Sequence, residues 1–324
     1  MITVSILALR NAVMASIADT RHVFTMVNSF LSNAGKPPLF SVQLVGLSKA
    51  LSLNEGLYSL HPDLLLEDVT HTNLIIVPSM TGDMMSATHL NREFAIWIAQ
   101  RYKEGAEVAS LCVGAFLLAF SGILKGKQCT THWAYANEFR HFYPSVRLLD
   151  EKVITDQQGL YSSGGNNAYW NLLLYLVEKY TDRQMAIHTA KYFVVDLDRT
   201  IQSPFVIFHG LKDHEDATVR KAQDYIEAHY QEKLHVETLA DKFSITRRTF
   251  ERRFKKATRH TVVEYIHRVK VEATKKQLEI GRKSVNEIMY SVGYVDIQAY
   301  RDVFKKVTGM TPLEYRNKYN KDAL

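Results

Sequence analysis

The C-terminal third of the chain repeats one short pattern at an offset of 50 residues. Phe250–Thr258 reads FERRFKKAT, and Tyr300–Thr308 reads YRDVFKKVT. Each copy follows a shorter stretch with the apolar spacing of a helix, Val236–Phe243 or Val285–Val292. A short helix followed by a longer one, present twice, predicts an all-α domain with two helix-turn-helix units.

Residues that begin and separate helices stand where this repeat needs them. Thr246 and Asp296 are suitable N-caps for the longer helix of each copy. Gly293 tolerates a positive φ between the helices of the second copy. The amphipathic stretch Val262–Leu278, followed by Gly281, is expected to join the two units.

The first 180 residues follow a different pattern, in which short apolar or β-branched runs alternate with longer helical stretches. That alternation predicts an α/β domain, a flavodoxin-like sandwich with a mostly parallel sheet. The expected strands are Thr3–Leu9, Ser41–Leu47, Asn73–Val77, Val108–Leu111 and Lys152–Thr155, and the expected helices include Ala18–Leu31, Leu90–Tyr102 and Asn167–Tyr180.

The strand signals stop at Asp182, and Gln184–Val195 has a helical pattern. The sequence therefore predicts a first domain over residues 1–195, a connecting segment over 196–213 and a second domain over 214–324.

Basic residues are concentrated in the second domain. Residues 241–324 hold 20 of the 40 Lys+Arg but only 10 of the 34 Asp+Glu. Such a block is typical of a domain that binds a polyanion, although a solvated basic surface gives the same count. No apolar run reaches the roughly 18 residues that span a bilayer, and no signal peptide is evident, so we expect a cytoplasmic protein that does not bind membranes.

The longer helix of the first copy combines an apolar back with a basic front. On a wheel drawn at about 100° per residue, Phe250 and Phe254 lie opposite the cations of the helix, a stripe that includes Arg259. Arg pairs well with guanine, and Glu251 could accept from cytosine, so this helix suits a major groove. The candidate DNA-binding residues are Arg247, Arg248, Thr249, Glu251, Arg252 and Lys255 in the first copy, and Ile297, Gln298, Arg301 and Lys305 in the second.

The second copy is the weaker electrostatic reader. Asp302 on its outer face would repel a phosphate unless Arg301 or Lys305 neutralises it. We therefore expect the first copy to supply more of the affinity.

Residues 215–320 resemble the DNA-binding domain of AraC/XylS-family transcription regulators. The resemblance rests on Leu239-Ala240, Phe250-x-Arg-x-Phe-Lys-Lys, Val292-Gly-Tyr, Phe304-Lys-Lys and Gly309-x-Thr-Pro-x-x-Tyr-Arg. It implies that one chain contacts two half-sites of double-stranded DNA, about one helical turn apart. Two positions depart from the pattern: Arg259 stands where glycine is usual, and Met289 where alanine is expected.

The run Val108–Ala115 predicts a strand, a sharp turn at Cys112 and a helix that begins near Gly114. A cysteine at such an elbow faces a helix N-terminus, whose dipole is expected to lower the thiol pKa and favour the thiolate. His132 follows after 20 residues. This spacing, together with the stretch Gly159–Asn167, resembles the ThiJ/PfpI superfamily over residues 1–180.

Two features argue against an enzyme. The connection after the first strand holds no acid before Asp19, although catalytic members of the superfamily place a carboxylate there. Val113 follows Cys112, so the adjacent Cys-His pair of the hydrolytic branch is absent. A thiolate without a positioned acid or base is a poor general catalyst. We interpret Cys112 as an inherited structural or pocket residue, with catalysis and redox sensing as the alternatives.

The two predicted domains in this order resemble the GlxA-like branch of bacterial regulators. That resemblance implies a DNA-binding transcription regulator, often an activator for the use of small nitrogenous metabolites, whose degenerate enzyme fold senses an effector and dimerises. Cys112 and Cys129 form no zinc-ligand set, so we expect free thiols, no metal and no cofactor. The predicted effector pocket comprises Met80, Cys112, Val113, His132 and Trp133. The alternatives are a cysteine-dependent hydrolase or lyase fused to a DNA-binding domain, and a nucleoid-type DNA protein without a ligand.

Overall fold

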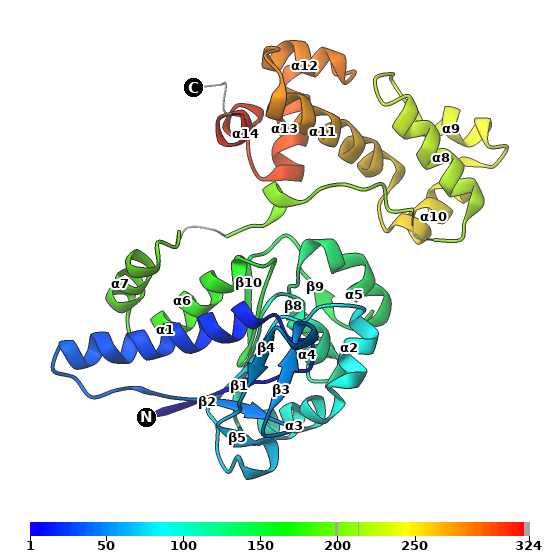
Figure 1. Cartoon of the computed structure of the whole chain (residues 1–324). Helices are drawn as coiled ribbons and strands as arrows, with labels where there is room; N and C mark the ends of the chain where they lie inside the picture. The colour runs from blue at the N-terminus through cyan, green and yellow to red at the C-terminus, as the bar shows by residue number, and fades with distance from the viewer. Residues whose placement is uncertain (198–199, 213, 321–324) are drawn as a thin grey trace. The chain divides into compact units, whose positions relative to one another are not determined.

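The computed structural model describes residues 1–197, 200–212 and 214–320, which form two compact units, Met1–Gln202 and Ser203–Leu324 (Figure 1). Residues 198–199 and 213 of the predicted connecting segment, and the last four residues of the predicted second domain, lie outside the described residues. The described part of the connecting segment is divided between the units. The backbone N–H of Gln202 donates to the Glu151 carbonyl at 2.9 Å, whereas that of Phe208 donates to the Glu272 carboxylate at 3.2 Å.

The first unit is built on a seven-stranded sheet in the order β10-β11-β7-β6-β1-β2-β5. All neighbouring strands are parallel except β10 and β11, which are antiparallel. This confirms the predicted mostly parallel sheet. The strands of the unit are β1 (Ile2–Leu7), β2 (Phe40–Gly46), β3 (Leu51–Leu53), β4 (Tyr58–Leu60), β5 (Leu64–Leu65), β6 (Leu74–Val77), β7 (Glu107–Ser110), β8 (Gln128–Cys129), β9 (Arg147–Leu148), β10 (Ile154–Gln157) and β11 (Leu160–Ser163).

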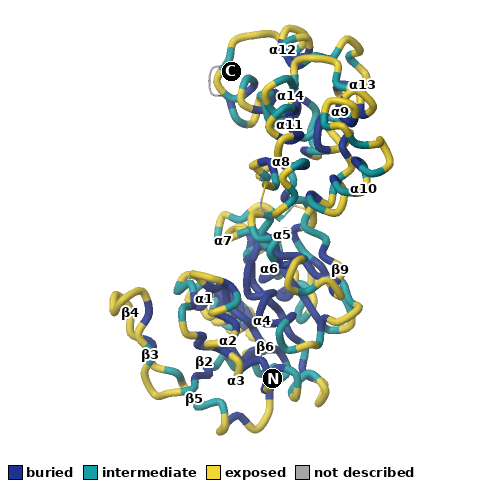
Figure 2. The backbone as a smooth tube through the Cα atoms, turned by 90° about the vertical axis from the view of Figure 1, so that its right-hand side faces the viewer, coloured by how far each residue is buried: buried dark blue, intermediate teal, exposed yellow. Residues whose placement is uncertain are grey.

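Helices cover both faces of this sheet. Helices α1 and α6 pack on strands β2 and β11, and α3 and α4 pack on β7 and β6. Because the middle of the sheet is covered on both sides, strand β6 is apolar throughout, and all four of its residues are buried (Figure 2). The helices of the unit are α1 (Met14–Asn33), α2 (Met84–Leu90), α3 (Arg92–Lys103), α4 (Ala115–Phe120), α5 (Ala136–Phe142), α6 (Ala168–Tyr180) and α7 (Arg183–Phe193).

In the described residues, the second unit is helical. Its helices are α8 (Ala217–Ala228), α9 (Val236–Lys242), α10 (Arg247–Thr258), α11 (Val262–Ile280), α12 (Val285–Ser291), α13 (Ile297–Thr308) and α14 (Pro312–Tyr319). The predicted helix-turn-helix units are α9–α10 and α12–α13, and α11 joins them. Thr246 and Asp296 cap α10 and α13 as predicted, because each side chain accepts from a backbone N–H in the first turn.

Candidate DNA-recognition surface and ligand site

Helix α10 is held by its apolar side and by an ion pair with the cap of α8. Phe250 and Phe254 are both fully buried, and they pack in the core of the first helix-turn-helix unit. On the same helix, the Arg253 guanidinium donates to both carboxylate oxygens of Asp216, at 2.8 and 2.6 Å. Because Asp216 also caps α8, this bidentate pair ties the orientation of α10 to that of α8.

The opposite side of α10 carries cations without partners. Arg248, Arg252 and Lys255 are exposed, and their side chains make no hydrogen bond or ion pair within the described residues. Three cations on one face, backed by two buried phenylalanines, give the helix a basic surface that can meet a phosphate or a base edge.

Two of the predicted DNA-binding residues, Arg247 and Glu251, are instead paired with each other. The Arg247 Nε donates to the Glu251 carboxylate at 3.1 Å, and its terminal nitrogen pairs with Glu237 of α9. These carboxylates raise the pKa of Arg247. The i, i+4 spacing of Arg247 and Glu251 was a visible signal for this pair. The Thr249 hydroxyl oxygen accepts from the Thr246 hydroxyl at 3.0 Å.

Helix α13 repeats the arrangement with fewer free cations. Tyr300 and Phe304 are buried, and Arg301 and Lys305 are exposed. Ile297 is half-buried against the small core around Tyr300.

The acid of α13 is engaged within its own helix. The Gln298 amide donates to the Asp302 carboxylate at 2.8 Å, a pair that the sequence reasoning missed although its spacing is i, i+4.

The predicted elbow is present at Cys112. Its φ is 55°, in the left-handed region that a residue with a side chain seldom adopts, and it begins a short 3-10 turn that leads into α4. A side chain at Gly114 would lie 2.6 Å from the Pro78 carbonyl, so only glycine fits there. The Cys112 thiol donates to the amide oxygen of Asn166 at 3.5 Å, and the backbone N–H of Cys112 donates to the Ser163 hydroxyl at 3.1 Å.

The expected low thiol pKa is wrong. Only 1% of Cys112 is exposed, and this burial raises its pKa. Hydrogen bonds from Ser79 and from the backbone of Val113 oppose the shift without reversing it. A buried thiolate loses more hydration than these two bonds restore, so the thiol is the favoured form.

The remaining predicted pocket residues differ in exposure. Met80 and Val113 are buried, with 3% of each exposed, whereas His132 and Trp133 are half-buried. The His132 Nδ1 accepts from the backbone N–H of Ala134 at 3.1 Å, and burial lowers the pKa of its ring.

Gly165 and Asn166 bring two of these residues to one loop. A side chain at Gly165 would lie 3.2 Å from the His132 ring, and Asn166 bonds Cys112. The sequence indicated this glycine-rich loop only as part of the fold, and it gave no sign that Asn166 is a partner of the thiol.

The first acid after strand β1 is engaged elsewhere. Asp19 accepts a hydrogen bond of 2.6 Å from the Tyr169 hydroxyl, and burial, together with this carboxylate, raises the pKa of Tyr169. The thiol of Cys112 therefore has an amide oxygen, rather than a carboxylate, as its hydrogen-bond acceptor.

Comparisons with known proteins agree with both halves of this description. Residues 25–179 match the DJ-1/PfpI family, and residues 239–318 match the helix-turn-helix domain family. The HTH-type transcriptional regulator GbdR of Pseudomonas aeruginosa is 23% identical over 307 residues, which cover 90% of this chain and 81% of that protein. The chain therefore combines a DJ-1/PfpI domain with an AraC-type helix-turn-helix domain, the architecture of related transcriptional regulators such as GbdR, and it is a DNA-binding transcription regulator.

Two further comparisons each cover only part of this chain. The bifunctional transcriptional activator/DNA repair enzyme AdaA of Bacillus subtilis is 39% identical over 93 residues, 29% of this chain and 44% of that protein. The crystal structure of a putative transcriptional regulator protein from Vibrio parahaemolyticus has a TM-score of 0.53 and 21% identity, and covers 59% of this chain and 98% of that one. This second likeness shows the fold alone.

The regulator departs from the AraC-type pattern at two positions, and the structure accommodates both. Arg259 ends α10 in the left-handed conformation, with φ 61°, where the equivalent Gly309 has φ 77°. Met289, in place of alanine, is buried with Val292 and Tyr300 in the small core beside α13.

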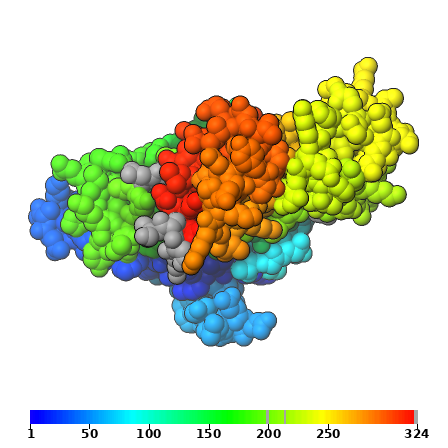
Figure 3. Space-filling view, turned by 90° about the horizontal axis from the view of Figure 1, so that it is seen from above, coloured from blue at the N-terminus to red at the C-terminus, as the bar shows by residue number. Residues whose placement is uncertain are grey.

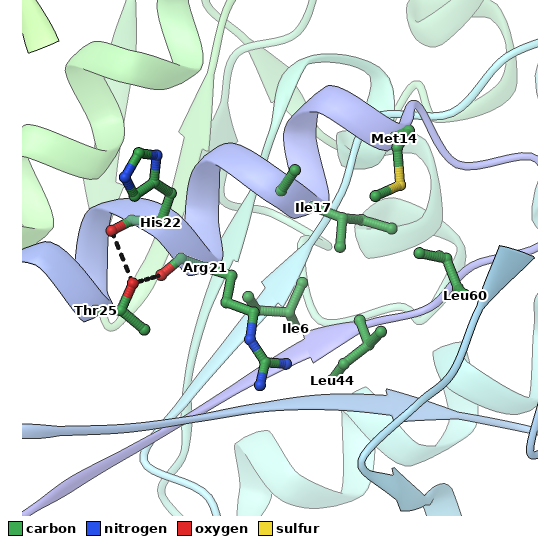
Figure 4. A pocket seen from close by; sticks show the side chains of 9 residues that line it. Ile6, Met14, Ile17, Arg21, His22, Thr25, Leu44 and Leu60 are labelled. Carbon is green, nitrogen blue, oxygen red and sulfur yellow. Dashed lines mark hydrogen bonds between the residues drawn. The ribbon is translucent and has the colours of Figure 1, made fainter. Parts of the chain in front are cut away.

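The first unit contains a hollow of about 390 Å³ beside α1 (Figure 4). It opens between α1 and the strands β1, β2 and β4, and its lining contains none of the five predicted pocket residues. The lining residues are Ile6, Met14, Ile17, Ala18, Arg21, His22, Thr25, Leu44 and Leu60.

Residues 1–197, 200–212 and 214–320 contain neither a membrane-spanning helix nor a metal-binding cluster. No helix there is long and apolar enough to cross a bilayer, and no group of three or more His, Cys, Asp or Glu side chains could hold a metal ion.

Proposed function

We propose that this AraC-type regulator is ligand-responsive, and that it activates genes for the use of a small, nitrogenous metabolite. It reads DNA with both recognition helices of one chain, α10 and α13, and it binds its effector at the Cys112 elbow. It functions as a homodimer, and it acts in the cytoplasm because its target is DNA. No catalytic step is assigned to it.

The observation that carries the DNA-reading proposal is the unpaired basic face of α10. Arg248, Arg252 and Lys255 are exposed and free of acidic partners within the described residues. Acids are nevertheless available nearby, because Glu237 and Glu251 both pair with Arg247. A helix whose surface only needs to be soluble usually interleaves charges of both signs along that face.

The acids of α10 have a supporting role in this proposal. The Arg247–Glu251 pair, with Glu237, fixes the first turn of α10 against α9, which is where the helix-turn-helix turn must be rigid. In α13, Gln298 and Asp302 satisfy each other's need for a partner, so Arg301 and Lys305 are the cations left for the phosphates.

The elbow is proposed as a binding site because its polar groups suit a ligand better than they suit catalysis. The thiol is protonated and its acceptor is Asn166, so a nucleophilic role has no base to support it. The half-buried His132 ring lies near Gly165, next to Asn166, and the half-buried Trp133 ring lies against it, so the two supply an imidazole with a lowered pKa and an aromatic face.

The experiment that tests the DNA proposal begins with selection of operators from random duplexes by the full-length protein. Arg252→Ala is then compared with Lys221→Ala, an exposed cation of α8, on the selected duplex and on a random one. We expect Arg252→Ala to lose about 1–3 kcal/mol on the selected duplex only. Equal losses on both duplexes would contradict base reading by α10.

A footprint of the wild type on the same duplex tests the number of half-sites. One chain is expected to protect two segments about 10 bp apart, and a dimer twice as many. A single protected segment per chain, or a monomer by light scattering at the binding concentration, would overturn that part of the proposal.

The effector proposal is tested by a thermal-shift screen of small amines, amino acids and carboxylates on the full chain. A true effector at 100 times its Kd adds about 2.7 kcal/mol of stability. Its effect should disappear in Asn166→Ala or His132→Asn. A hit whose shift survives both substitutions would place the effector elsewhere.

A further inference from the structure

The two helix-turn-helix units touch each other through two backbone segments. The loop between α8 and α9, residues 229–235, leads into the first helix-turn-helix unit, and the turn between α12 and α13, residues 292–296, lies within the second. Figures 1 and 3 show the yellow α8–α9 region beside the orange α12 region. Tyr230 packs against the apolar residues of both cores, so the contact has an apolar part.

The polar part of this contact is the side chain of Lys270. It lies on α11, the helix that joins the units, and only 6% of it is exposed. Its ammonium donates to the carbonyls of Val292 at 2.9 Å, Gly293 at 3.2 Å and Glu232 at 3.3 Å. An ammonium has three N–H donors, so these three carbonyls occupy all of them.

The carbonyls come from both units. Glu232 is in the loop that leads into the first helix-turn-helix unit, and Val292 and Gly293 are in the turn of the second. The Tyr294 ring adds a further contact, because its centroid lies 5.2 Å from the ammonium nitrogen. Burial lowers the pKa of Lys270, as expected for a cation that bonds to carbonyls in place of water.

The backbones approach so closely here that only glycine fits at position 293. Its φ is 76°, and a side chain would collide with the Gln231 carbonyl and lie 2.8 Å from the Lys270 nitrogen. The turn between α12 and α13 is therefore held directly against the loop between α8 and α9, with the Lys270 ammonium between them.

A second buried lysine of α11 serves for comparison. Lys275 is 4% exposed and pairs with Glu272 on the same helix at 2.8 Å, and it donates to the Val206 carbonyl at 2.6 Å. Neither of these two partners belongs to the α12–α13 unit. Lys270 and Lys275 thus share helix, residue type and burial, but the bonds that reach both units are those of Lys270.

We propose that Lys270 is a positioning residue that fixes the separation of the two recognition helices, and that it thereby sets the spacing of half-sites that the regulator accepts. This inference rests on the proposed reading of DNA by both units. One added base pair displaces the second half-site by about 3.4 Å and rotates it by roughly 35°. A rigid pair of readers cannot follow that change, whereas a loosely joined pair can.

The test uses the full-length protein and the duplex it selects, together with two variants of that duplex in which one base pair is inserted or deleted between the half-sites. We expect the wild type to lose at least about tenfold in affinity on either altered duplex, because one unit no longer reaches its bases. Lys270→Met should reduce that loss to about threefold or less, and Lys270→Arg, which keeps a cationic donor, should retain most of it.

Lys275→Met is the matched control and should keep the wild-type spacing loss. Far-ultraviolet circular dichroism and the unfolding midpoint establish that each variant is folded. A folded Lys270→Met with the wild-type spacing loss would overturn the proposal, and so would an equal reduction in Lys275→Met, because general destabilisation would then explain both.

A second variant covers the case in which Lys270→Met does not fold. Gly293→Asn keeps Lys270, and asparagine tolerates a positive φ, but its side chain must push the turn away from Gln231. It should change the preferred spacing or flatten the preference. An unchanged preference overturns the proposal, as does a wild type that binds all three duplexes within about threefold. Absence of any selected duplex would instead contradict the proposed function itself.

Discussion

The side-chain oxygen of Gln202 accepts a hydrogen bond of 3.0 Å from the backbone N–H of Gly165, in the loop that also holds Asn166 beside the Cys112 thiol. Its amide nitrogen donates to the Thr131 carbonyl at 2.9 Å, next to His132. The last residue of the first unit is therefore inserted between the two loops of the proposed effector site. A side chain at Gly164 would lie 2.7 Å from the Gln202 oxygen, so the space is already full.

We expect Gln202→Ala to lower the free energy of unfolding of the first unit by about 2 kcal/mol, because the Gly165 N–H and the Thr131 and Asp150 carbonyls lose their Gln202 partner. Urea unfolding of the full-length chain measures this. Gln184→Ala, an exposed glutamine of α7, is the control and should change stability by less than about 0.5 kcal/mol. A loss of that small size for Gln202→Ala would mean that water replaces its bonds.

The ends of the two recognition helices allow a paired prediction. Arg259 and Gly309 occupy equivalent left-handed positions, and the arginine is strained there while the glycine is not. Arg259→Gly should therefore raise stability by about 1 kcal/mol, and Gly309→Ala should lower it by a similar amount. Thermal unfolding of the two variants would refute this explanation if both moved the midpoint in the same direction.

The sequence predicts those parts of the structure that are determined by residues close together in the chain. The 50-residue repeat and the caps Thr246 and Asp296 are local features, and they predicted the helix-turn-helix units almost to the residue. Strand β11 was missed because its residues, Leu160–Ser163, are few and half polar. They are buried only because β7 and β10 pair with them on either side, which a single segment does not reveal.

The same distinction between local and distant determinants applies to the candidate site. Exposure of Arg248 and Arg252 follows from helical periodicity, and the sequence predicted it. The Cys112 pKa depends instead on how much chain surrounds the elbow. The helix N-terminus alone would lower the thiol pKa, but burial of Cys112 by the surrounding chain raises it. Asn166 and Gln202 are distant in sequence from Cys112, so no spacing pointed to them.

The reactivity of the elbow thiol follows from its burial. In a Cys129→Ala variant, where Cys112 is the only cysteine, the native protein should react with a neutral disulfide reagent at about pH 7.5 at least about 100-fold more slowly than the unfolded chain. Stopped-flow or manual absorbance measurements give both rates. A native rate equal to or above the unfolded one would restore the thiolate expectation and reopen a catalytic or redox role.

His132 predicts how the first unit responds to acid. Burial holds its folded pKa below the ordinary value of 6.5, so the unfolded chain binds the proton more readily. The neutral ring's contribution to stability is thus complete above about pH 6.5 and is lost as the pH falls through the folded pKa. His132→Asn preserves the acceptor for the Ala134 N–H but cannot titrate. Unfolding measured from about pH 7.5 to about pH 5 should show a shallower decline in this variant, and parallel curves would contradict the assignment.

The last prediction separates residues that read bases from residues that anchor phosphates. Lys255 and Lys305 are exposed at equivalent positions of the two repeats, toward the C-terminal end of each recognition helix, and Lys255 lies about one turn beyond Arg252. The N-terminal part of a recognition helix is the part that reaches base edges, so these lysines are placed to meet the backbone of the duplex.

Replacing either lysine by alanine should weaken binding to selected and random duplexes alike, and should reduce the slope of log affinity against log salt by about 0.9 for each phosphate that is no longer neutralised. Arg252→Ala should instead relax the preference at one base position. Lys221→Ala should leave the slope unchanged.

The two repeats are not expected to contribute equally to the affinity for DNA. Within the described residues, the face of α10 has three unpaired cations, whereas that of α13 has Asp302 between Arg301 and Lys305, with only the Gln298 amide as its partner. We therefore expect Lys255→Ala to cost more affinity at low salt than Lys305→Ala, while both change the slope by the same amount. An unchanged slope in Lys255→Ala would show that this lysine is only a solvated residue of a basic face.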